Sequence, residues 1–209
     1  PSSADSLRGP QYYASVLDAI RALPGVEAAG SIRDLPTRGT GEMRRAAQLG
    51  LPAGEGGVDA TVQLQHISTD FFKAIGASLE SGRDFQPTDR AGAPIVLIVN
   101  EALAKRYWPG ENAVGKVLHA GSTDIQIVGV VEDIHQKGLS EPAEPTIYIH
   151  ALQNMRAGMS IVVRTKRDPL RIAGAVRNAI WSVNRDQPIV EITTMEDVLG
   201  SAVARQKLL

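Results

Sequence analysis

The sequence predicts an α+β protein in which both chain ends build one helix-backed α/β sheet and a smaller α+β sub-domain is inserted into it. A helix-strand-strand pattern opens the chain, and a strand-helix-strand-helix pattern closes it. Each set is too small to enclose a core alone, so we expect the two to share one sheet. Between them, short apolar strands alternate with turn-rich segments. We therefore assign residues 1–70 and 153–209 to the first sub-domain and residues 71–152 to the inserted one.

The first helix is predicted to begin at Pro10, because proline suits the first helical position. Its apolar stripe consists of Tyr12, Val16, Ile20 and Leu23. Strands are expected over residues 26–32 and 58–66, where apolar residues alternate. The glycine-rich stretch between them, residues 35–57, predicts a long flexible excursion. Its Arg44-Arg45 pair offers a contact to a partner, although a solvated loop is the simpler interpretation.

The inserted part is predicted to contain two short helices. Thr69-Asp70 is expected to cap the first, which ends at Ile75 before Gly76. Asn100 is a good N-cap for the second, which Pro109-Gly110 closes. Strands are expected at residues 95–99, 117–118, 125–131 and 146–149.

The C-terminal part is predicted to alternate strands and helices. After a strand at residues 161–165, Asp168 caps a helix with Pro169 at its first position. The buried stripe of this helix is expected to be Leu170, Ala173, Val176 and Ile180. A strand at residues 189–192 follows, and Thr193-Thr194-Met195-Glu196 is a capping-box pattern that opens the last helix.

Composition excludes several classes of function. Net charge is −1, the pI is about 6.5 and aromatic residues make up 4%, so neither nucleic acid nor anionic lipid is favoured as a partner. The chain has no cysteine, which excludes disulfides and thiol nucleophiles. No apolar run approaches the ~18 residues that a membrane helix needs. The chain opens at Pro1 and closes within a predicted helix, so we expect it to be a segment of a longer protein.

One motif imitates a nucleotide-binding loop. Residues 110–116 have the glycine-lysine skeleton of a P-loop, but Val117 stands where a Ser or Thr hydroxyl should reach Mg²⁺. A P-loop also joins a strand to a long helix, whereas this segment follows a helix and leads into a strand. We interpret it as a structural turn.

The titratable residues form no catalytic constellation. None of His66, His119, His135 and His150 shows the spacing of a helical zinc pair. Asp133 and His135 would share one face of a continued strand, but a solvated strand end is the simpler interpretation. His66 is expected to be a core or boundary residue.

Other candidate groups have structural interpretations as well. Glu132 and Asp133 are adjacent in a strand and so point to opposite faces. Glu141 and Glu144 flank prolines, and Ser68 and Ser122 lie in capping or turn contexts. Arg83-Asp84 is expected to form a turn held by local hydrogen bonds. We therefore assign no catalytic, cofactor-binding or metal-binding residue.

The ordered motifs between residues 66 and 148 carry a family resemblance. They are Ser68…Phe71-Phe72, Gly82-Arg83-Asp84-Phe85, Val99-Asn100-Glu101-Ala102-Leu103-Ala104, Tyr107-Trp108-Pro109-Gly110-Glu111, Val114-Gly115-Lys116, Ile127-Val128-Gly129-Val130-Val131…Asp133 and Pro145…Tyr148. In this order and spacing the stretch resembles the periplasmic core domain of MacB/FtsX-type ABC transporter permeases, with particular affinity to an uncharacterised group. The resemblance implies structural roles for Phe71, Gly82, Arg83, Phe85, Asn100, Pro109, Gly115, Lys116, Gly129 and Asp133.

The resemblance also implies a location and a role. Such a domain lies on the extracytoplasmic side of the cell membrane, between two permease helices, with a porter-like part made from both ends of the segment. It would be non-catalytic and would couple ATP-driven motion of those helices to export or to an outer protein partner. ATP would be hydrolysed by a separate ATP-binding subunit or domain across the membrane. A permease dimer is expected, although the isolated domain is expected to be a monomer.

Two other functions compete with this one. The first is a ligand-capture module that binds a peptide, lipid or small molecule between the sub-domains. A deep apolar cleft and a saturable shift in melting temperature would favour it. The second is a hydrolase, which would need convergent Ser/His/Asp or metal geometry in a pocket.

Overall fold

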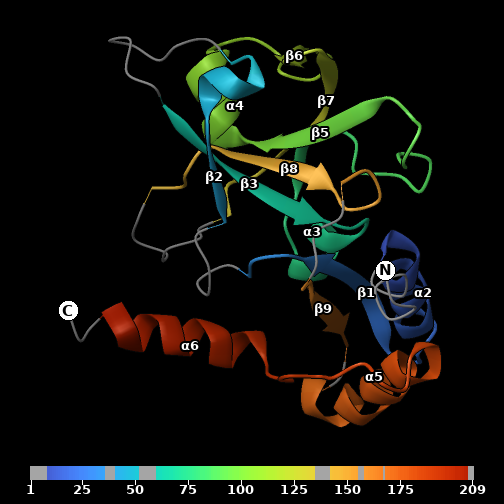
Figure 1. The fold of residues 1–209 in the computed structure, drawn as a ribbon. Coiled ribbons are helices and arrows are strands. Elements are labelled where there is room, and N and C mark those ends of the chain that lie inside the picture. Colours follow the sequence, from blue (N-terminus) through green and yellow to red (C-terminus); the bar gives the residue numbers. More distant parts are fainter. Residues whose placement is uncertain are drawn as a thin grey trace.

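The computed structural model describes residues 9–35, 41–51, 60–134, 142–154, 158–166 and 168–206, and of residues 202–206 only the backbone. Its centre is a mixed nine-stranded sheet in the order β4-β7-β5-β8-β3-β1-β9, with β2 added to β3 and β6 added to β7 (Figure 1). Helices cover parts of both faces. The predicted α+β class is therefore confirmed.

The helices are α2 (Pro10–Arg21), α3 (Phe71–Ile75), α4 (Glu101–Tyr107), α5 (Pro169–Val183), α6 (Met195–Gln206) and the 3₁₀ turn η1 (Ala46–Leu49). The strands are β1 (Val26–Ile32), β2 (Glu42–Arg45), β3 (Thr61–Ile67), β4 (Leu79–Gly82), β5 (Ile95–Asn100), β6 (Val117–Ala120), β7 (Thr123–Val131), β8 (Thr146–His150) and β9 (Ser160–Thr165).

The sheet has a narrow point between β3 and β1. Strand β3 pairs in parallel with β8 from Gln63↔Thr146 to Ile67↔His150, but its register with β1 consists of Ile32↔Ile67 alone. Strand β1 in turn pairs antiparallel with β9 along its length. We call β2–β8 with α4 the upper half, and α2, β1, β9, α5 and the described residues that follow α5 the lower half (Figure 1). The sub-domain division at residues 70/71 and 152/153 stays a prediction.

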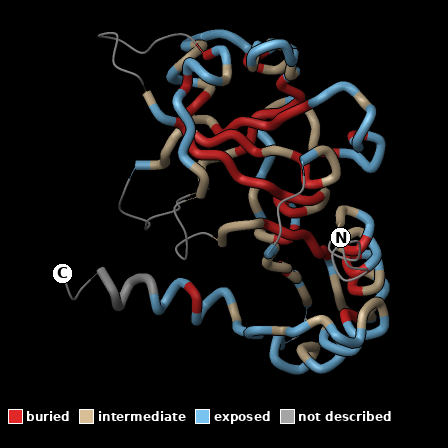
Figure 2. Tube along the Cα trace, in the orientation of Figure 1, coloured by how far each residue is buried: buried red, intermediate tan, exposed pale blue. Residues whose placement is uncertain are grey.

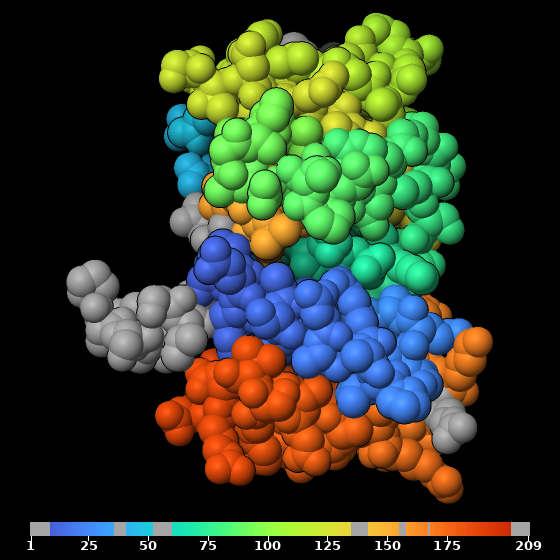
Figure 3. Space-filling view, turned by 90° about the vertical axis from the view of Figure 1, so that its right-hand side faces the viewer, coloured from blue at the N-terminus to red at the C-terminus, as the bar shows by residue number. Residues whose placement is uncertain are grey.

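Three apolar clusters fill the space around the sheet, whose central strands are coloured as buried along most of their length in Figure 2. The first lies under α3 and draws residues from both halves, such as Ile32 and Tyr148 around Phe72. The second lies on the opposite face under α4, whose Leu103 is fully buried. The third joins α2, α5 and β1, and α2 and α5 lie side by side in Figure 3. The apolar cluster beneath α3 therefore extends across the narrow point.

Several local predictions are confirmed. Asn100 caps α4 by accepting a hydrogen bond from the Leu103 amide at 3.1 Å. Asp168 caps α5 through the Leu170 amide at 2.9 Å, with Pro169 at the first helical position. The opening helix begins at Pro10, as predicted.

The glycine-rich excursion is more ordered than predicted. Its residues 42–45 form β2, which pairs antiparallel with β3 from Glu42↔Leu64 to Arg45↔Thr61, and η1 follows. The strand was missed because Glu-Met-Arg-Arg at an exposed edge lacks alternating apolar residues. Arg44 pairs with Glu42 on this edge. Residues 36–40 and 52–57 of the excursion lie outside the described residues.

Two capping predictions need correction. Asp70 precedes α3 in a left-handed conformation, φ 60°, and makes no side-chain cap. Its carboxylate lies instead beside Arg21. At α6 the cap is shifted by one residue, because the Asp197 amide donates to Thr194 Oγ1 at 3.1 Å. Glu196 is therefore not the reciprocal acidic residue.

Two C-terminal predictions are wrong. Residues 189–192 form no strand in the structure, and Val190 is 97% exposed. Leu170 is exposed, because α5 contacts α2 through its C-terminal half, where Ala179 and Ile180 are buried. Among the described residues, no helix is both long and apolar enough to cross a membrane.

Candidate functional site: contacts that hold the two halves together

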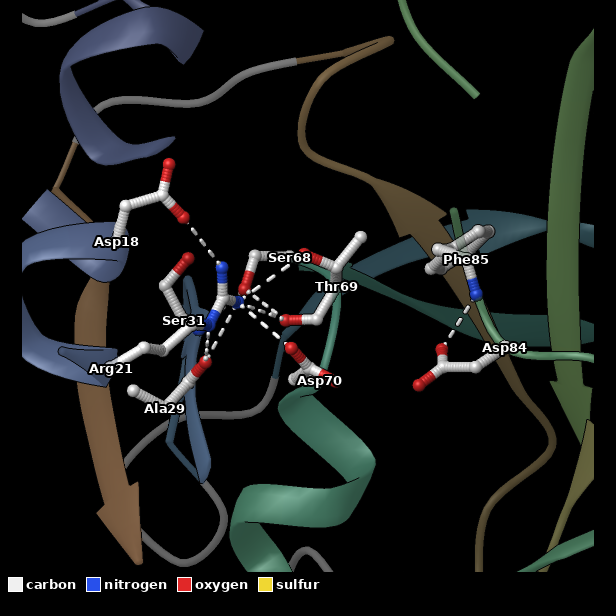
Figure 4. A network of polar contacts seen from close by, with 9 residues as sticks. All are labelled: Asp18, Arg21, Ala29, Ser31, Ser68, Thr69, Asp70, Asp84 and Phe85. Atoms are coloured by element: carbon white, nitrogen blue, oxygen red, sulfur yellow. Dashed lines mark hydrogen bonds and ion pairs between the residues drawn. The ribbon is translucent and has the colours of Figure 1, made fainter. Parts of the chain in front are cut away.

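Arg21 joins three elements at the narrow point of the sheet (Figure 4). It ends α2, and its Nε and Nη2 donate to the Ala29 carbonyl of β1 at 3.1 and 2.9 Å. Nη2 also donates to the Thr69 carbonyl, in the turn between β3 and α3, at 3.1 Å. Asp18 and Asp70 supply opposite charges at 3.1 and 3.3 Å. A single guanidinium therefore links the lower half to the turn that leaves the upper half.

A serine pair and a glycine reinforce this junction. Ser68 Oγ accepts from the Ser31 amide at 2.8 Å and donates to the Thr69 carbonyl at 2.9 Å. A Cβ at Gly30 would lie 2.5 Å from Phe71 Cα, so the backbone of α3 rests directly on β1. Phe71 is fully buried at that point. Ser68 thus has a structural partner, and the junction is closely packed.

Asn100 is the centre of a second network, inside the upper half. Its Oδ1 accepts from the amides of Leu103 and Thr146, and its Nδ2 donates to Asp133 Oδ1 and the Glu144 carbonyl. All four distances lie between 2.8 and 3.1 Å. Asp133 Oδ1 also accepts from the Ala102 amide. These two motif residues therefore tie α4 to the end of β7 and to the start of β8.

Arg83 forms a fork with Asp89 across the turn after β4. Its Nη1 and Nη2 donate to the two carboxylate oxygens at 2.7 and 3.0 Å, and the Gln86 amide donates to the same carboxylate. Burial raises the pKa of Asp89, but the hydrogen bonds from Arg83 and Gln86 outweigh it and leave that pKa below its ordinary value. The local hydrogen bonds predicted for Arg83-Asp84 are present, but the turn itself lies at residues 87–88.

A buried aromatic stack supports this turn from beneath. The ring of Phe85 stacks on His150 with centroids 4.7 Å apart, and His150 Nδ1 lies 2.5 Å from the Asp89 carbonyl. Burial lowers the pKa of His150, which keeps the ring neutral. His150 therefore belongs to the core.

Asp84 lies in the same turn and accepts from the Phe85 amide at 2.7 Å (Figure 4). Its pKa is raised to about 6, mainly by burial and to a lesser degree by the Asp70 carboxylate, against the hydrogen bond from Phe85 and the charge of Arg83. A raised carboxyl pKa is a mark of functional sites, but Asp70, the second carboxylate near Asp84, is paired with Arg21 in the junction. The raised pKa of Asp84 makes the stability of the fold depend on pH.

Two glycines let β4 approach β7. Gly82 has φ +77°, and a Cβ there would lie 2.2 Å from the Val128 carbonyl oxygen. A Cβ at Gly129 would lie 2.5 Å from the Arg83 carbonyl oxygen. Both are motif residues at which a side chain has no room.

The glycine-lysine segment is a turn between α4 and β6, as predicted. The Gly115 amide donates to the Ile127 carbonyl at 2.8 Å, and the Ile127 amide donates to the Lys116 carbonyl at 2.9 Å. Lys116 Nζ pairs with Glu111 at 2.6 Å and lies over the Trp108 ring. Pro109 lies in the turn that follows α4. The lysine is therefore occupied within its own turn.

The remaining titratable candidates are scattered. His66 is buried in β3, and His119 pairs with Asp124 at the surface. Glu132 accepts from the Ser78 amide, so it and Asp133 have separate structural partners. His135 and Glu141 lie outside the described residues. Within the described ranges, no three His, Cys, Asp or Glu side chains are grouped as metal ligands would be.

The ligand-capture hypothesis requires a cleft between the two predicted sub-domains, and the surface has two hollows to consider. One, of about 540 Å³, is lined by residues 87–93 of the inserted part. The other, of about 560 Å³, is lined by Pro24, Asp168, Arg171 and Ile172. Each lies within one predicted sub-domain, and neither lies between the two.

Sequence reasoning missed Arg21, Gly30 and Asp89. The only local signal at Arg21 is a basic residue in the last turn of a helix, which usually interacts with that helix's own end. Asp89 sits in a polar turn without a distinguishing pattern. Their roles depend on partners that are distant in the chain or set by the turn geometry.

Comparison with known families decides the identity of the domain. The profile of the MacB-like periplasmic core domain matches residues 2–179. The chain belongs to this family. It is therefore the extracytoplasmic domain of a MacB-like ABC transporter permease.

Individual relatives agree. The chain is 32% identical over 87 residues to the macrolide export ATP-binding/permease protein MacB of Bartonella henselae, a match of 41% of this chain and 13% of that protein. It is 27% identical over 79 residues to the MacB protein of Salmonella typhimurium, covering 37% and 12%. The chain thus spans only a small part of the curated relatives that it matches.

The fold is also similar to a solved structure. The periplasmic region of MacB from Actinobacillus actinomycetemcomitans superposes with a TM-score of 0.52 at 16% identity, over 81% of this chain and 73% of that one. At this identity the likeness concerns the fold alone.

Proposed function

We propose that this domain is a non-catalytic mechanical element of its permease. It would carry ATP-driven motion of the membrane helices outward, to export or to an outer protein partner. The ATP-binding subunit or domain would act across the membrane, and a dimer of permeases would present two such domains. The observation that carries this proposal is the Arg21 junction, in which a side chain of α2 holds the Ala29 carbonyl of β1 and reaches across the narrow point to Thr69 and Asp70.

The physical argument concerns stiffness. Within the described structure, a force applied to the lower half reaches the upper half through the narrow β1–β3 contact and the elements that cross it. Arg21 and the close contact of Gly30 with Phe71 both lie there. Packed interiors transmit strain because they have low compressibility. Contacts of this kind make the two halves move as one body.

The proposal is tested by distance measurements within the intact permease. Because this chain has no cysteine, spin labels at Ser122→Cys in the upper half and Arg185→Cys in the lower half report on this domain. We expect the distance between them to be the same in the nucleotide-free and ATP-bound permease in nanodiscs. The distance from either label to the membrane surface should change with ATP.

Each alternative outcome has a clear meaning. If ATP leaves both labels in place relative to the membrane, the mechanical role is wrong. If the two halves close on each other without ATP when a peptide or lipid is added, the ligand-capture function replaces it. Arg21→Ala should broaden the distance distribution within the domain, whereas Arg171→Ala, on an exposed side chain, should not.

We also propose that the isolated domain is a monomer. Tethering in a membrane raises the effective concentration of a second copy, so a weak interface is sufficient there. Sedimentation at about 10 µM should give the monomer mass, and a tight dimer would contradict the proposal.

A further inference from the structure

Asp70 has an unusual backbone conformation at the junction between the two halves. In the part of the chain that the structure describes, it is the one residue other than glycine with a positive φ, 60°. The left-handed region is unfavourable for a residue with a Cβ, although aspartate tolerates it better than most. Asp70 also directly precedes α3, where an aspartate ordinarily has an extended backbone and caps the helix. A residue stays in such a conformation only when its surroundings hold it there.

Contacts with the lower half hold Asp70 in this conformation (Figure 4). Its carboxylate lies 3.3 Å from Nη2 of Arg21 on α2. The same nitrogen donates to the Thr69 carbonyl, so the peptide group that precedes Asp70 is fixed as well. A Cβ at Gly30 of β1 would lie 2.5 Å from Phe71 Cα and 3.1 Å from the carbonyl carbon of Asp70. The left-handed turn therefore lays the start of α3 directly on β1.

The Asp70 carboxylate has a second possible partner in its own helix. An N-cap aspartate with an extended backbone accepts a hydrogen bond from the amide two or three positions later, here Phe72 or Lys73. In the structure Asp70 makes no such bond. The cap that the Thr69-Asp70 pattern predicts and the observed ion pair with Arg21 need different backbone conformations. They are therefore alternative uses of one carboxylate.

We propose that Asp70 is a two-state hinge. In the coupled state, which the structure shows, its backbone is left-handed and its carboxylate pairs with Arg21. In the released state its backbone is extended and its carboxylate caps α3. The path of the chain into α3 then changes, and the backbone of Phe71 moves away from Gly30.

The two states differ little in free energy. Release exchanges an ion pair between partly exposed side chains for a helix cap and an unstrained backbone, which are contributions of similar size. Burial of Phe71 and the hydrogen bond from Arg21 to Thr69 favour the coupled state. The released state is therefore the minor one.

This hinge goes beyond the proposed mechanical function and does not depend on it. In sequence α3 connects β3 to β4, both in the upper half, but its start rests on β1 of the lower half. Release of α3 would loosen the contact between the halves while the β1–β3 pairing at Ile32↔Ile67 stays intact. The domain would thus have a softer state besides the rigid one.

NMR relaxation dispersion and saturation-transfer measurements on this chain test the hinge, because the Cα and Cβ shifts of residue 70 distinguish a left-handed from an extended backbone. We expect exchange on the millisecond timescale at residues 69–73. The minor state should have the shifts of an extended backbone at Asp70. A minor state that keeps the left-handed shifts would overturn the inference.

Two unrelated substitutions should populate the same released state. Arg21→Ala removes the ionic partner of Asp70, whereas Gly30→Ala presses a methyl group against the start of α3 and changes no charge. Each should raise the released population at least about tenfold, and the minor-state shifts should be the same in both. Arg171→Ala, at an exposed arginine that pairs with Asp168, should leave the population unchanged. Two different minor states would mean that no common hinge exists.

Substitutions of Asp70 separate the two uses of its carboxylate. Asp70→Gly permits the left-handed backbone but supplies no cap, so the minor state with a capped α3 should disappear. Asp70→Ser can cap α3 but has no charge for Arg21, so the released state should become the major one. A capped minor state in Asp70→Gly, or a left-handed residue 70 in Asp70→Ser, contradicts the hinge. The mechanical function is judged separately, by the ATP-dependent displacement in the intact permease.

Discussion

The two halves of the sheet differ in how fully their strands and apolar side chains are buried. In the upper half, β5 lies between β7 and β8, and its residues 96–100 are all buried. In the lower half, β9 is an edge strand with several half-exposed residues. Ten large hydrophobic residues of the described structure are exposed, and six of them lie between residues 170 and 199. The six are Leu170, Trp181, Val190, Ile192, Met195 and Leu199.

The difference indicates where stability and interaction reside. The upper half has a core of its own under α4, and its motif residues Arg83, Asn100 and Asp133 have their partners within it. The lower half exposes apolar surface of the kind that marks contact sites. We therefore expect substitutions in the upper half to lower the free energy of unfolding most. Substitutions on the surface of the lower half should lower it little or raise it.

The largest effect is expected for Asn100→Ala in the upper half. The change removes four hydrogen bonds at a fully buried position and leaves the Thr146 amide and Asp133 with fewer partners. We expect the free energy of unfolding to fall by about 3–5 kcal/mol in denaturant titration. Asn112→Ala, which removes one exposed hydrogen bond to the Val114 amide, should cost about 1 kcal/mol or less. Similar costs for the two would contradict the comparison.

The next effect is expected for Gly82→Ala, where β4 meets β7. The new methyl group would collide with the Val128 carbonyl, and the residue would keep a left-handed backbone. The cost should be about 3 kcal/mol in the same titration. Gly121→Ala provides a matched control, since its φ of +64° is similar but nothing lies within 4 Å of the new Cβ. It should cost only the backbone term of about 1 kcal/mol.

Substitution by alanine is expected to lower the free energy of unfolding at one glycine, at the narrow point, and to raise it at another, in α5. Gly30→Ala would press against Phe71 Cα and should lower the free energy of unfolding by about 2 kcal/mol. Gly174→Ala lies within α5 with no atom within 4 Å of the Cβ, and should stabilise by about 0.5–1 kcal/mol. Thermal melts of both variants give the test. A destabilised Gly174→Ala would mean that this face of α5 is already covered.

A further effect, smaller than those of the Asn100 and Gly82 substitutions, concerns pH and Asp84. Its folded pKa of about 6 exceeds the unfolded value of about 3.9, so the folded state binds its proton more tightly. This contribution to stability is present below about pH 4 and is lost as pH rises through 6. Asp84→Asn, which keeps an acceptor for the Phe85 amide, should therefore stabilise by about 1–2 kcal/mol at pH 8 and change little at pH 4.

The control for this prediction is a surface carboxylate. Asp186→Asn, at an exposed position, should change the free energy of unfolding by less than about 0.5 kcal/mol at either pH. A gain for Asp84→Asn that is equal at pH 4 and pH 8 would show that ionisation is not its cause.

Sequence alone determined the features whose signals are local. The caps at Asn100 and Asp168, the helix start at Pro10 and the turn at Gly110–Lys116 each depend on residues within a few positions, so propensity and spacing predict them. The ordered motifs also identified the family, because their spacing reflects a shared sheet. The same local reasoning predicted a strand at residues 189–192, which the structure does not form.

Tertiary structure decided the features whose partners are distant. Arg21 meets Thr69 across 48 residues, and Asn100 meets Thr146 across 46, so neither contact has a signature near its own position. Gly30 needs to be small only because α3 lies on it. A hydrogen-bond donor or a small residue specifies what it can contact, but the register of β1, β3 and β8 decides what it does contact.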